Sequence, residues 1–97
     1  MNGILIQYVY NGDEEKWQAA IDEFIENIQS DKRLNGHFSY EVVCHEGGER
    51  AHIGHWDSAE TLEHLQLQDF FKIFSKHVKE FAGDTLNPKR FYSKAKT

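Results

Sequence analysis

The chain has 97 residues and a formal charge of −5, and 13% of its residues are aromatic. This length suits one domain, and the aromatic content is too high for a disordered chain. No apolar run approaches the roughly 20 residues of a membrane helix, no signal peptide is recognisable, and the acidic balance argues against nucleic-acid binding. The single cysteine, Cys44, cannot form an internal disulfide. We therefore expect one cytoplasmic domain over residues 1–97, with no membrane or nucleic-acid partner.

The first third of the chain predicts a strand followed by a helix. Residues 4–10, ILIQYVY, are mostly β-branched or aromatic and end at an Asn-Gly pair, which is typical of a strand before a turn. From Asp13 onward, apolar residues recur at helical spacing: Trp17, Ala20, Ile21, Phe24, Ile25 and Ile28. Lys32 and Arg33 suit the carboxyl end of this helix, and a second Asn-Gly pair marks where it stops.

The middle of the chain predicts a β-hairpin formed by residues 38–45 and 50–56. Gly47 and Gly48 suit a two-residue turn between the two strands. That turn fixes the register, because a shift of one residue would exchange the two faces of a strand. One face, mostly apolar, then pairs Cys44 with Ala51, Val42 with Ile53 and Tyr40 with His55. The other face pairs Val43 with His52 and Ser39 with Trp56.

The last third predicts helical structure and a short final strand. Asp57-Ser58 followed by Glu60 resembles a capping box, and Gly83 ends the helical pattern. The phase of the apolar stripe slips around residues 67–69, so we expect a kink or two consecutive helices there. Residues 90–92 predict the final strand, and the Lys-rich end is expected to fray. The stripe consists of Leu62, Leu65, Phe70, Phe74, Val78 and Phe81.

This β-α-β-β-α-β order predicts an α+β fold, a ferredoxin-like antiparallel sheet with both helices on one face. The first strand then has Ile4, Ile6, Tyr8 and Tyr10 on its inner side. Leu5 and Val9 lie on the uncovered face, where they would form a costly apolar patch in a monomer. We therefore expect a homodimer formed by sheet-on-sheet packing, with Trp56, Val43 and His52 at the interface.

The segment from His55 to Leu65, HWDSAETLEHL, followed by Asp69-Phe70-Phe71 and Phe74, resembles the strand-to-helix signature of the antibiotic biosynthesis monooxygenase family. The resemblance implies a dimeric α+β barrel with a pocket between sheet and helices in each protomer. It also implies oxygenation of a small aromatic, quinol or polyketide-like substrate with no metal or flavin cofactor.

Two histidines are the candidate catalytic residues that this resemblance suggests. Such chemistry needs an apolar cavity and polar groups that deprotonate a phenol and hold the resulting anion. His64 matches the helix histidine of the family and could accept the phenolic proton; the alternative is a half-exposed helix residue. His55 stands where the family more often has Glu, and its alternative role is a buried histidine bonded to Tyr40 or to a helix group.

Four further residues are candidates for substrate binding. Tyr8 and Tyr40 could each offer a phenol to the cavity, although tyrosine also fills cores. Gln7, the one amide of the first strand, could orient a carbonyl or lie in the dimer interface. Phe74 matches the family's helix phenylalanine.

Three alternatives to an oxygenase stay open. Haem-degrading relatives use an Asn, a Trp and a haem-ligating His where this chain has Gln7, Leu65 and Ser75, so haem cleavage is the least favoured. A non-catalytic small-molecule-binding or stress-response barrel, and a pure dimerisation module, need no catalytic residue. We expect no metal site, because His52 and His55 point to opposite faces of a strand.

Overall fold

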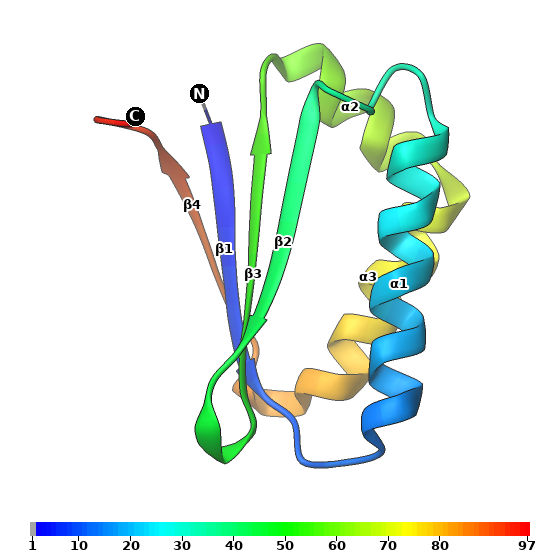
Figure 1. Ribbon diagram of the computed structural model, residues 1–97, viewed down its shortest axis with the longest axis vertical. Coiled ribbons are helices and arrows are strands. Elements are labelled where there is room, and N and C mark those ends of the chain that lie inside the picture. The colour runs from blue at the N-terminus through cyan, green and yellow to red at the C-terminus, as the bar shows by residue number, and fades with distance from the viewer. Residues whose placement is uncertain (1) are drawn as a thin grey trace.

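The computed structural model describes residues 2–97, which form a four-stranded antiparallel sheet with three helices on one face (Figure 1). The opposite face of the sheet carries no helix. The elements are β1 (Asn2–Val9), α1 (Glu14–Ser30), β2 (Phe38–Cys44), β3 (Glu49–Trp56), α2 (Ala59–Leu67), α3 (Asp69–Ala82) and β4 (Asn87–Tyr92).

The strand order is β2-β3-β1-β4, and every neighbouring pair is antiparallel. This is the predicted ferredoxin-like arrangement, in which the two central strands come from different halves of the chain. The last strand is longer than the predicted residues 90–92. It begins at Asn87 and includes Pro88, which an edge strand tolerates because its outer side makes no ladder hydrogen bonds.

The helices follow the predicted pattern except at the end of α1. The Asp13 carboxylate caps its first turn by accepting hydrogen bonds from the backbone N–H groups of Glu15 and Lys16. The helix ends at Ser30, so Lys32 and Arg33 lie beyond its last turn, and their predicted place inside the helix is wrong. The predicted break at residues 67–69 is confirmed, since α2 ends and α3 begins on either side of one extended residue.

The register of the β2–β3 hairpin differs by one residue from the prediction. Cys44 pairs with Arg50 and not with the residue after it. The loop has three residues, Glu46–Gly48, and the backbone N–H of His45 donates to the carbonyl oxygen of Glu49 at 2.8 Å. Both glycines of the loop have positive φ, which allows the chain to reverse over this odd number of residues.

This shift exchanges the two faces of β3. Arg50, His52 and Trp56 lie on the helix side and are at most 5% exposed. His55 lies on the open side, in line with Ile53. The prediction that puts Trp56 and His52 on the open face and His55 under the helices is therefore wrong.

Polar partners explain why two basic side chains are buried on the helix side. The Arg50 guanidinium pairs with the Glu14 carboxylate and lies 4.3 Å from the centre of the Trp17 ring. The imidazole of His52 is hydrogen-bonded on both nitrogens to tyrosine hydroxyls. Buried polar groups with such partners avoid most of the desolvation cost that an unpaired group would incur.

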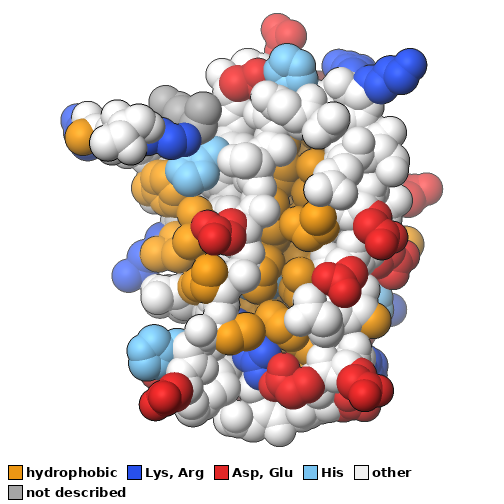
Figure 2. All heavy atoms as spheres, viewed as in Figure 1, with side chains coloured by type: hydrophobic (Ala, Val, Ile, Leu, Met, Phe, Trp, Pro, Cys, Tyr) orange, Lys and Arg blue, Asp and Glu red, His pale blue; other side chains and the backbone are white. Residues whose placement is uncertain are grey.

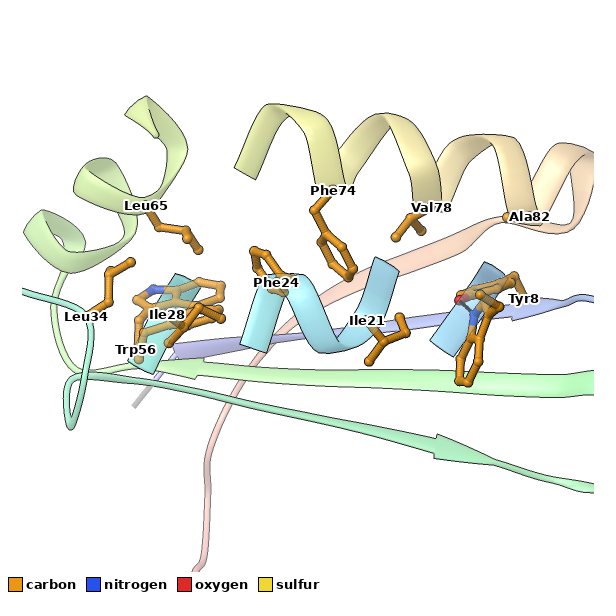
Figure 3. Close-up of a cluster of buried hydrophobic side chains, with 12 residues drawn as sticks. Tyr8, Ile21, Phe24, Ile28, Leu34, Trp56, Leu65, Phe74, Val78 and Ala82 are labelled. Atoms are coloured by element: carbon orange, nitrogen blue, oxygen red, sulfur yellow. Dashed lines mark hydrogen bonds between the residues drawn. The ribbon is translucent and has the colours of Figure 1, made fainter. Parts of the chain in front are cut away.

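One hydrophobic core lies between the sheet and the helices (Figure 3). Leu65, Phe74 and Val78 point from α2 and α3 toward the sheet, and Trp56 meets them from β3. Ile4, Ile6, Tyr8 and Tyr10 all belong to or pack against this core, so the predicted inner face of β1 is confirmed.

Hydrophobic side chains also reach the surface. Figure 2 shows them along the groove between β2 and α1 and on the side of the sheet away from the helices. Val9 and Val43, on the open face, are 39% and 40% exposed. Within residues 2–97, no helix combines the length and the apolar character needed to cross a bilayer.

Truncating the side chain of Leu34 tests the packing of this core at a position that lines no pocket. Leu34 is fully buried, so Leu34→Ala is expected to lower the free energy of unfolding by about 2–5 kcal/mol. Leu67→Ala is the matched control: Leu67 is 66% exposed, and the expected change is within about 0.5 kcal/mol. Urea denaturation followed by tryptophan fluorescence measures both, and equal losses would contradict the packing described.

Candidate functional site

A pocket of about 240 Å³ lies between the sheet and helices α2 and α3. Its sheet wall comes from the helix-facing side of all four strands, through Ile4, Ile6, Phe38, Tyr40, Trp56, Pro88 and Arg90. Its helix wall consists of Phe24, Leu62, Leu65, Gln66, Phe71, Phe74, Ser75, Val78 and Lys79, and Leu86 completes the lining. The lining is mostly apolar with a few polar groups, which is typical of a small-molecule site.

Aromatic rings hold one wall of the pocket in place. The rings of Phe24 and Phe74 are parallel, with centroids 3.8 Å apart. Tyr40 presents its edge to both, at 5.0 Å and 5.9 Å between centroids. Stacked and edge-to-face rings each add to stability beyond their buried area, so these contacts stabilise the wall. It offers a flat aromatic surface to a ligand.

Two cations, Lys79 and Arg90, line the same pocket. Both residues are exposed, and neither forms a salt bridge with a carboxylate of residues 2–97. The guanidinium carbon of Arg90 lies 5.1 Å from the centre of the Trp56 ring, which positions it by a cation–π contact. The pocket therefore joins apolar walls to a positive potential.

Behind Tyr40 lies a buried chain of hydrogen bonds. The indole N–H of Trp17 donates to the Tyr8 hydroxyl at 2.8 Å. The Tyr8 hydroxyl lies 2.7 Å from Nε2 of His52, and the Tyr40 hydroxyl lies 2.7 Å from Nδ1. We call these four side chains the Trp17–Tyr40 network. Only Tyr40 of the four also lines the pocket.

Burial keeps this network neutral. It lowers the pKa of His52 to about 4, because a charged imidazole would lose its hydration. Burial likewise raises the pKa values of the Tyr8 and Tyr40 hydroxyls. At neutral pH, His52 is therefore an uncharged imidazole between two protonated tyrosines.

His64, the predicted base, does not line this pocket. Its Nε2 lies 2.8 Å from a carboxylate oxygen of Asp31, in a separate surface hollow. A second pair, His37 and Asp57, lines the same hollow, with 2.6 Å between nitrogen and oxygen. Although burial opposes the change, the hydrogen bond from His64 helps hold the pKa of Asp31 below its usual value.

The other predicted residues fall in three places. Tyr40 and Phe74 line the pocket, as predicted for substrate contacts, and Tyr8 lies behind it in the network. Gln7 is exposed on the open face of the sheet, where it pairs with Ala51. His55 lies on that face too, with its ring 5.3 Å from that of Phe91, so the structure does not bring the two candidate catalytic histidines together.

Sequence reasoning missed Arg90, Lys79 and Trp56 as pocket residues. Arg90 is predicted only as the first residue of the final strand, because that prediction leaves out Pro88, which lies two residues earlier on the same face. Lys79 lies one helical turn after Ser75, and both line the pocket, a spacing that the sequence shows. Trp56 was assigned to the open face through the incorrect hairpin register.

Solved structures with this arrangement are numerous. Rv0793 from Mycobacterium tuberculosis matches with a TM-score of 0.77 and 13% identity, over 98% of this chain and 96% of that one. SnoaB from Streptomyces nogalater, a cofactor-independent oxygenase, matches with TM-scores of 0.78 and 0.75 in two structures. Its identity is 8%, over 98% of this chain and 94% of SnoaB. An antibiotic biosynthesis monooxygenase matches with a TM-score of 0.64 and 11% identity, over 96% of this chain and 98% of that one.

The chain has the fold of the antibiotic biosynthesis monooxygenases. The α+β fold of the single chain, expected from the HWDSAETLEHL segment, is thereby confirmed. No protein-family model and no curated protein sequence matches the chain. At these identities the likeness concerns the backbone, so the chemistry must be argued from the side chains in the pocket.

The described residues also bear on metal binding. Among residues 2–97, no group of three or more His, Cys, Asp or Glu side chains is arranged to hold a metal ion. His77, the histidine nearest in sequence to the ligand position of the haem-degrading relatives, does not line the pocket. It stacks on Phe81, with 6.2 Å between ring centroids.

The low pKa of His52 predicts a specific loss of stability in acid. The unfolded imidazole takes up a proton near pH 6.5 and the folded one near pH 4, so unfolding binds a proton between these values. The contribution of His52 to stability is therefore constant above about pH 6.5 and falls by about 3 kcal/mol as the pH drops to 4. Urea denaturation at pH 7, 5.5 and 4 measures this loss.

The matched variant is His52→Gln, whose amide keeps one donor and one acceptor. It is expected to be less stable than the natural chain at pH 7, and the difference should shrink toward pH 4. If the free energies of unfolding of the two proteins changed equally with pH, His52 would titrate in the folded state as it does in the unfolded one. That result would contradict its neutral buried state.

Proposed function

We propose that the chain is a cofactor-independent monooxygenase that oxygenates a small aromatic phenol or quinol in the pocket between the sheet and helices α2 and α3. The observation that carries the proposal is the aromatic pocket with two unpaired cations, Lys79 and Arg90, in its lining. The shared fold with SnoaB, itself a cofactor-independent oxygenase, supports the reaction class. The proposal explains why an apolar pocket carries positive charge.

The volume of the pocket favours a substrate of one or two rings. An apolar cavity of about 150 Å³ holds one benzene, and sites for drug-sized ligands begin near about 300 Å³. At about 240 Å³, this pocket lies between these values. A bicyclic quinol fits this range better than a large polyketide does.

The two cations favour the ionised form of a phenol. A positive charge within about 4–6 Å lowers the pKa of an acid by about 1–3 units. Lys79 and Arg90 would therefore make a bound quinol more acidic, and its proton can leave to water at the exposed side of the pocket. The quinolate that results is electron-rich and reacts with O₂ without a cofactor.

The reaction then takes place on the substrate itself. The quinolate gives electrons to O₂, and a bond forms between oxygen and a ring carbon that carries hydrogen. The peroxide anion then takes up a proton from water to give a hydroperoxide. Loss of water from the hydroperoxide leaves one oxygen atom on the ring as a carbonyl and the other in water. The protein binds the anion, holds the ring against Phe24 and Phe74, and excludes bulk water from the reacting carbon.

A binding protein with no catalytic step is the second candidate. One observation favours it: among residues 2–97, no carboxylate or imidazole lines the pocket, so no side chain there is an evident general base. The role of His64 or His55 as a base stays a prediction, and both lie outside this lining. Enzyme-dependent oxygen uptake separates the two candidates.

The first test is oxygen uptake with 1,4-dihydroxynaphthalene. The natural chain should consume O₂ faster than the autoxidation measured without protein. Lys79→Met and Arg90→Met should each lower kcat/KM by about tenfold, because each removes one charge that stabilises the quinolate. An oxygen electrode measures the rates.

Lys76→Met is the control for charge. Lys76 is exposed on the same helix and does not line the pocket, so this variant should keep the natural rate. His64→Ala tests the alternative base in the same assay. Oxygen uptake no faster than autoxidation would contradict the oxygenase proposal and leave the binding protein as the candidate function. Loss of activity in His64→Ala alone would assign the base to the hollow that contains His64.

We also propose that the chain forms a homodimer through the open face of its sheet. Leu5 and Ile53 lie side by side in the two central strands of this face, and Val43 is exposed at its edge. The rings of His55 and Phe91 meet edge to face there. Polar residues such as Gln7, Glu41 and Lys89 surround these side chains, so the face is mixed with an apolar centre. An exposed apolar centre is costly in a monomer, and a second copy offers a complementary surface.

The variant Ile53→Glu tests the dimer. A carboxylate at the centre of this face would be buried unpaired in the interface, so the variant should sediment as a monomer at micromolar concentration while the natural chain sediments as a dimer. Ile73→Glu is the matched control, because Ile73 is 51% exposed on α3 and should leave the dimer intact. A natural chain that sediments as a monomer would contradict the proposal.

A further inference from the structure

The Trp17–Tyr40 network has a direction that follows from its donors and acceptors. An indole N–H can only donate, so the oxygen of Tyr8 accepts the hydrogen bond from Trp17. The hydroxyl hydrogen of Tyr8 is then directed to Nε2 of His52, 2.7 Å away. A neutral imidazole has one donor and one acceptor, so its hydrogen is on Nδ1 and is donated to the oxygen of Tyr40.

The opposite direction would leave a buried hydrogen without a partner. If Nε2 carried the hydrogen, Tyr8 would accept from both Trp17 and His52, and its own hydroxyl hydrogen would have no acceptor. Tyr8 is 3% exposed, so water offers little compensation. An unsatisfied buried donor is costly, and the first direction is therefore favoured.

This direction leaves the hydroxyl hydrogen of Tyr40 uncommitted. Unlike Tyr8, Tyr40 is only half-buried, so this is the less costly of the two places for a hydrogen without a protein partner. The oxygen of Tyr40 already accepts from Nδ1 of His52, and no other protein partner of this hydroxyl occurs among residues 2–97. Tyr40 lines the pocket. Its ring lies against Gly54 of β3, where an added Cβ would come within 3.1 Å of it, so the bare backbone at Gly54 lets the ring lean toward His52.

We propose that Tyr40 donates a hydrogen bond to an anionic oxygen of the pocket's ligand, and that His52 is the positioning residue that keeps this hydrogen turned away from the protein. The pocket then binds a phenolate by a neutral donor at Tyr40 as well as by the charges of Lys79 and Arg90. This inference rests on the pocket named in the proposed function, but it concerns binding and needs no oxygenation.

The test uses 4-nitrophenol, a single-ring probe whose phenolate and phenol differ in colour. The natural chain should bind the phenolate more tightly than the phenol. Tyr40→Phe keeps the ring and removes the donor, so its Kd for the phenolate should rise about tenfold or more, as expected for a lost hydrogen bond to a charged group. His52→Leu should also weaken phenolate binding, without changing the binding of the neutral phenol.

Tyr92→Phe is the matched control. Tyr92 is 66% exposed and does not line the pocket, so the same chemical change there should leave both affinities unaltered. Equal phenolate affinity in Tyr40→Phe and the natural chain would overturn the inference and leave the proposed function standing. No binding of either form by the natural chain would overturn both.

A measurement on the unaltered protein keeps the inference testable if the variants fold poorly. Nitrogen-15 NMR correlates each imidazole hydrogen with its own ring nitrogen. The expected result for His52 is a hydrogen on Nδ1, with Nε2 unprotonated. A hydrogen on Nε2 would reverse the network, commit the Tyr40 hydrogen to His52 and overturn the proposal.

Discussion

The buried imidazole of His52 between two tyrosine hydroxyls is the interaction on which the rest of the structure depends. It requires β3 to turn His52 toward the helices, and the pleat then places Trp56 on the same side and His55 on the other. Trp56 in turn contributes to the pocket and carries Arg90 on its ring. The register of the β2–β3 hairpin therefore determines which side chains of β3 lie in the core, in the pocket and on the open face.

The sequence predicted the architecture well because its main signals are local. Helical spacing, the two Asn-Gly stops and the phase slip near Gln68 identify the strands, α1 and the division between α2 and α3, and their order allows few topologies. The register failed because it depends on one residue of loop length. Nothing local distinguishes a two-residue turn at Gly47-Gly48 from the three-residue loop observed, and a simple hydrophobic pattern favours burying Ile53 over His52.

The site was harder to predict because its residues meet only in three dimensions. Tyr40 is predicted as a substrate contact from the expected core face of its strand, and Phe74 from its match to the family's helix phenylalanine. His64 was identified by resemblance, and the structure places it beside Asp31 in another hollow. Arg90 and Lys79 belong to different elements and look like ordinary surface cations until β4 and α3 bring them to one pocket. Buried polar networks such as the one around His52 arise from mutual hydrogen bonding that no pattern in a single segment reveals.

The central claim is that this pocket, and no other hollow of the molecule, binds a small aromatic anion. The most direct measurement is a titration of the isotope-labelled natural chain with 1-naphthol, followed by NMR chemical shifts. The account predicts that the largest changes occur at Phe74, Tyr40, Lys79 and Arg90, with His64 and His37 unaffected. Changes confined to His64, Asp31 and their neighbours, or none at all, would contradict it.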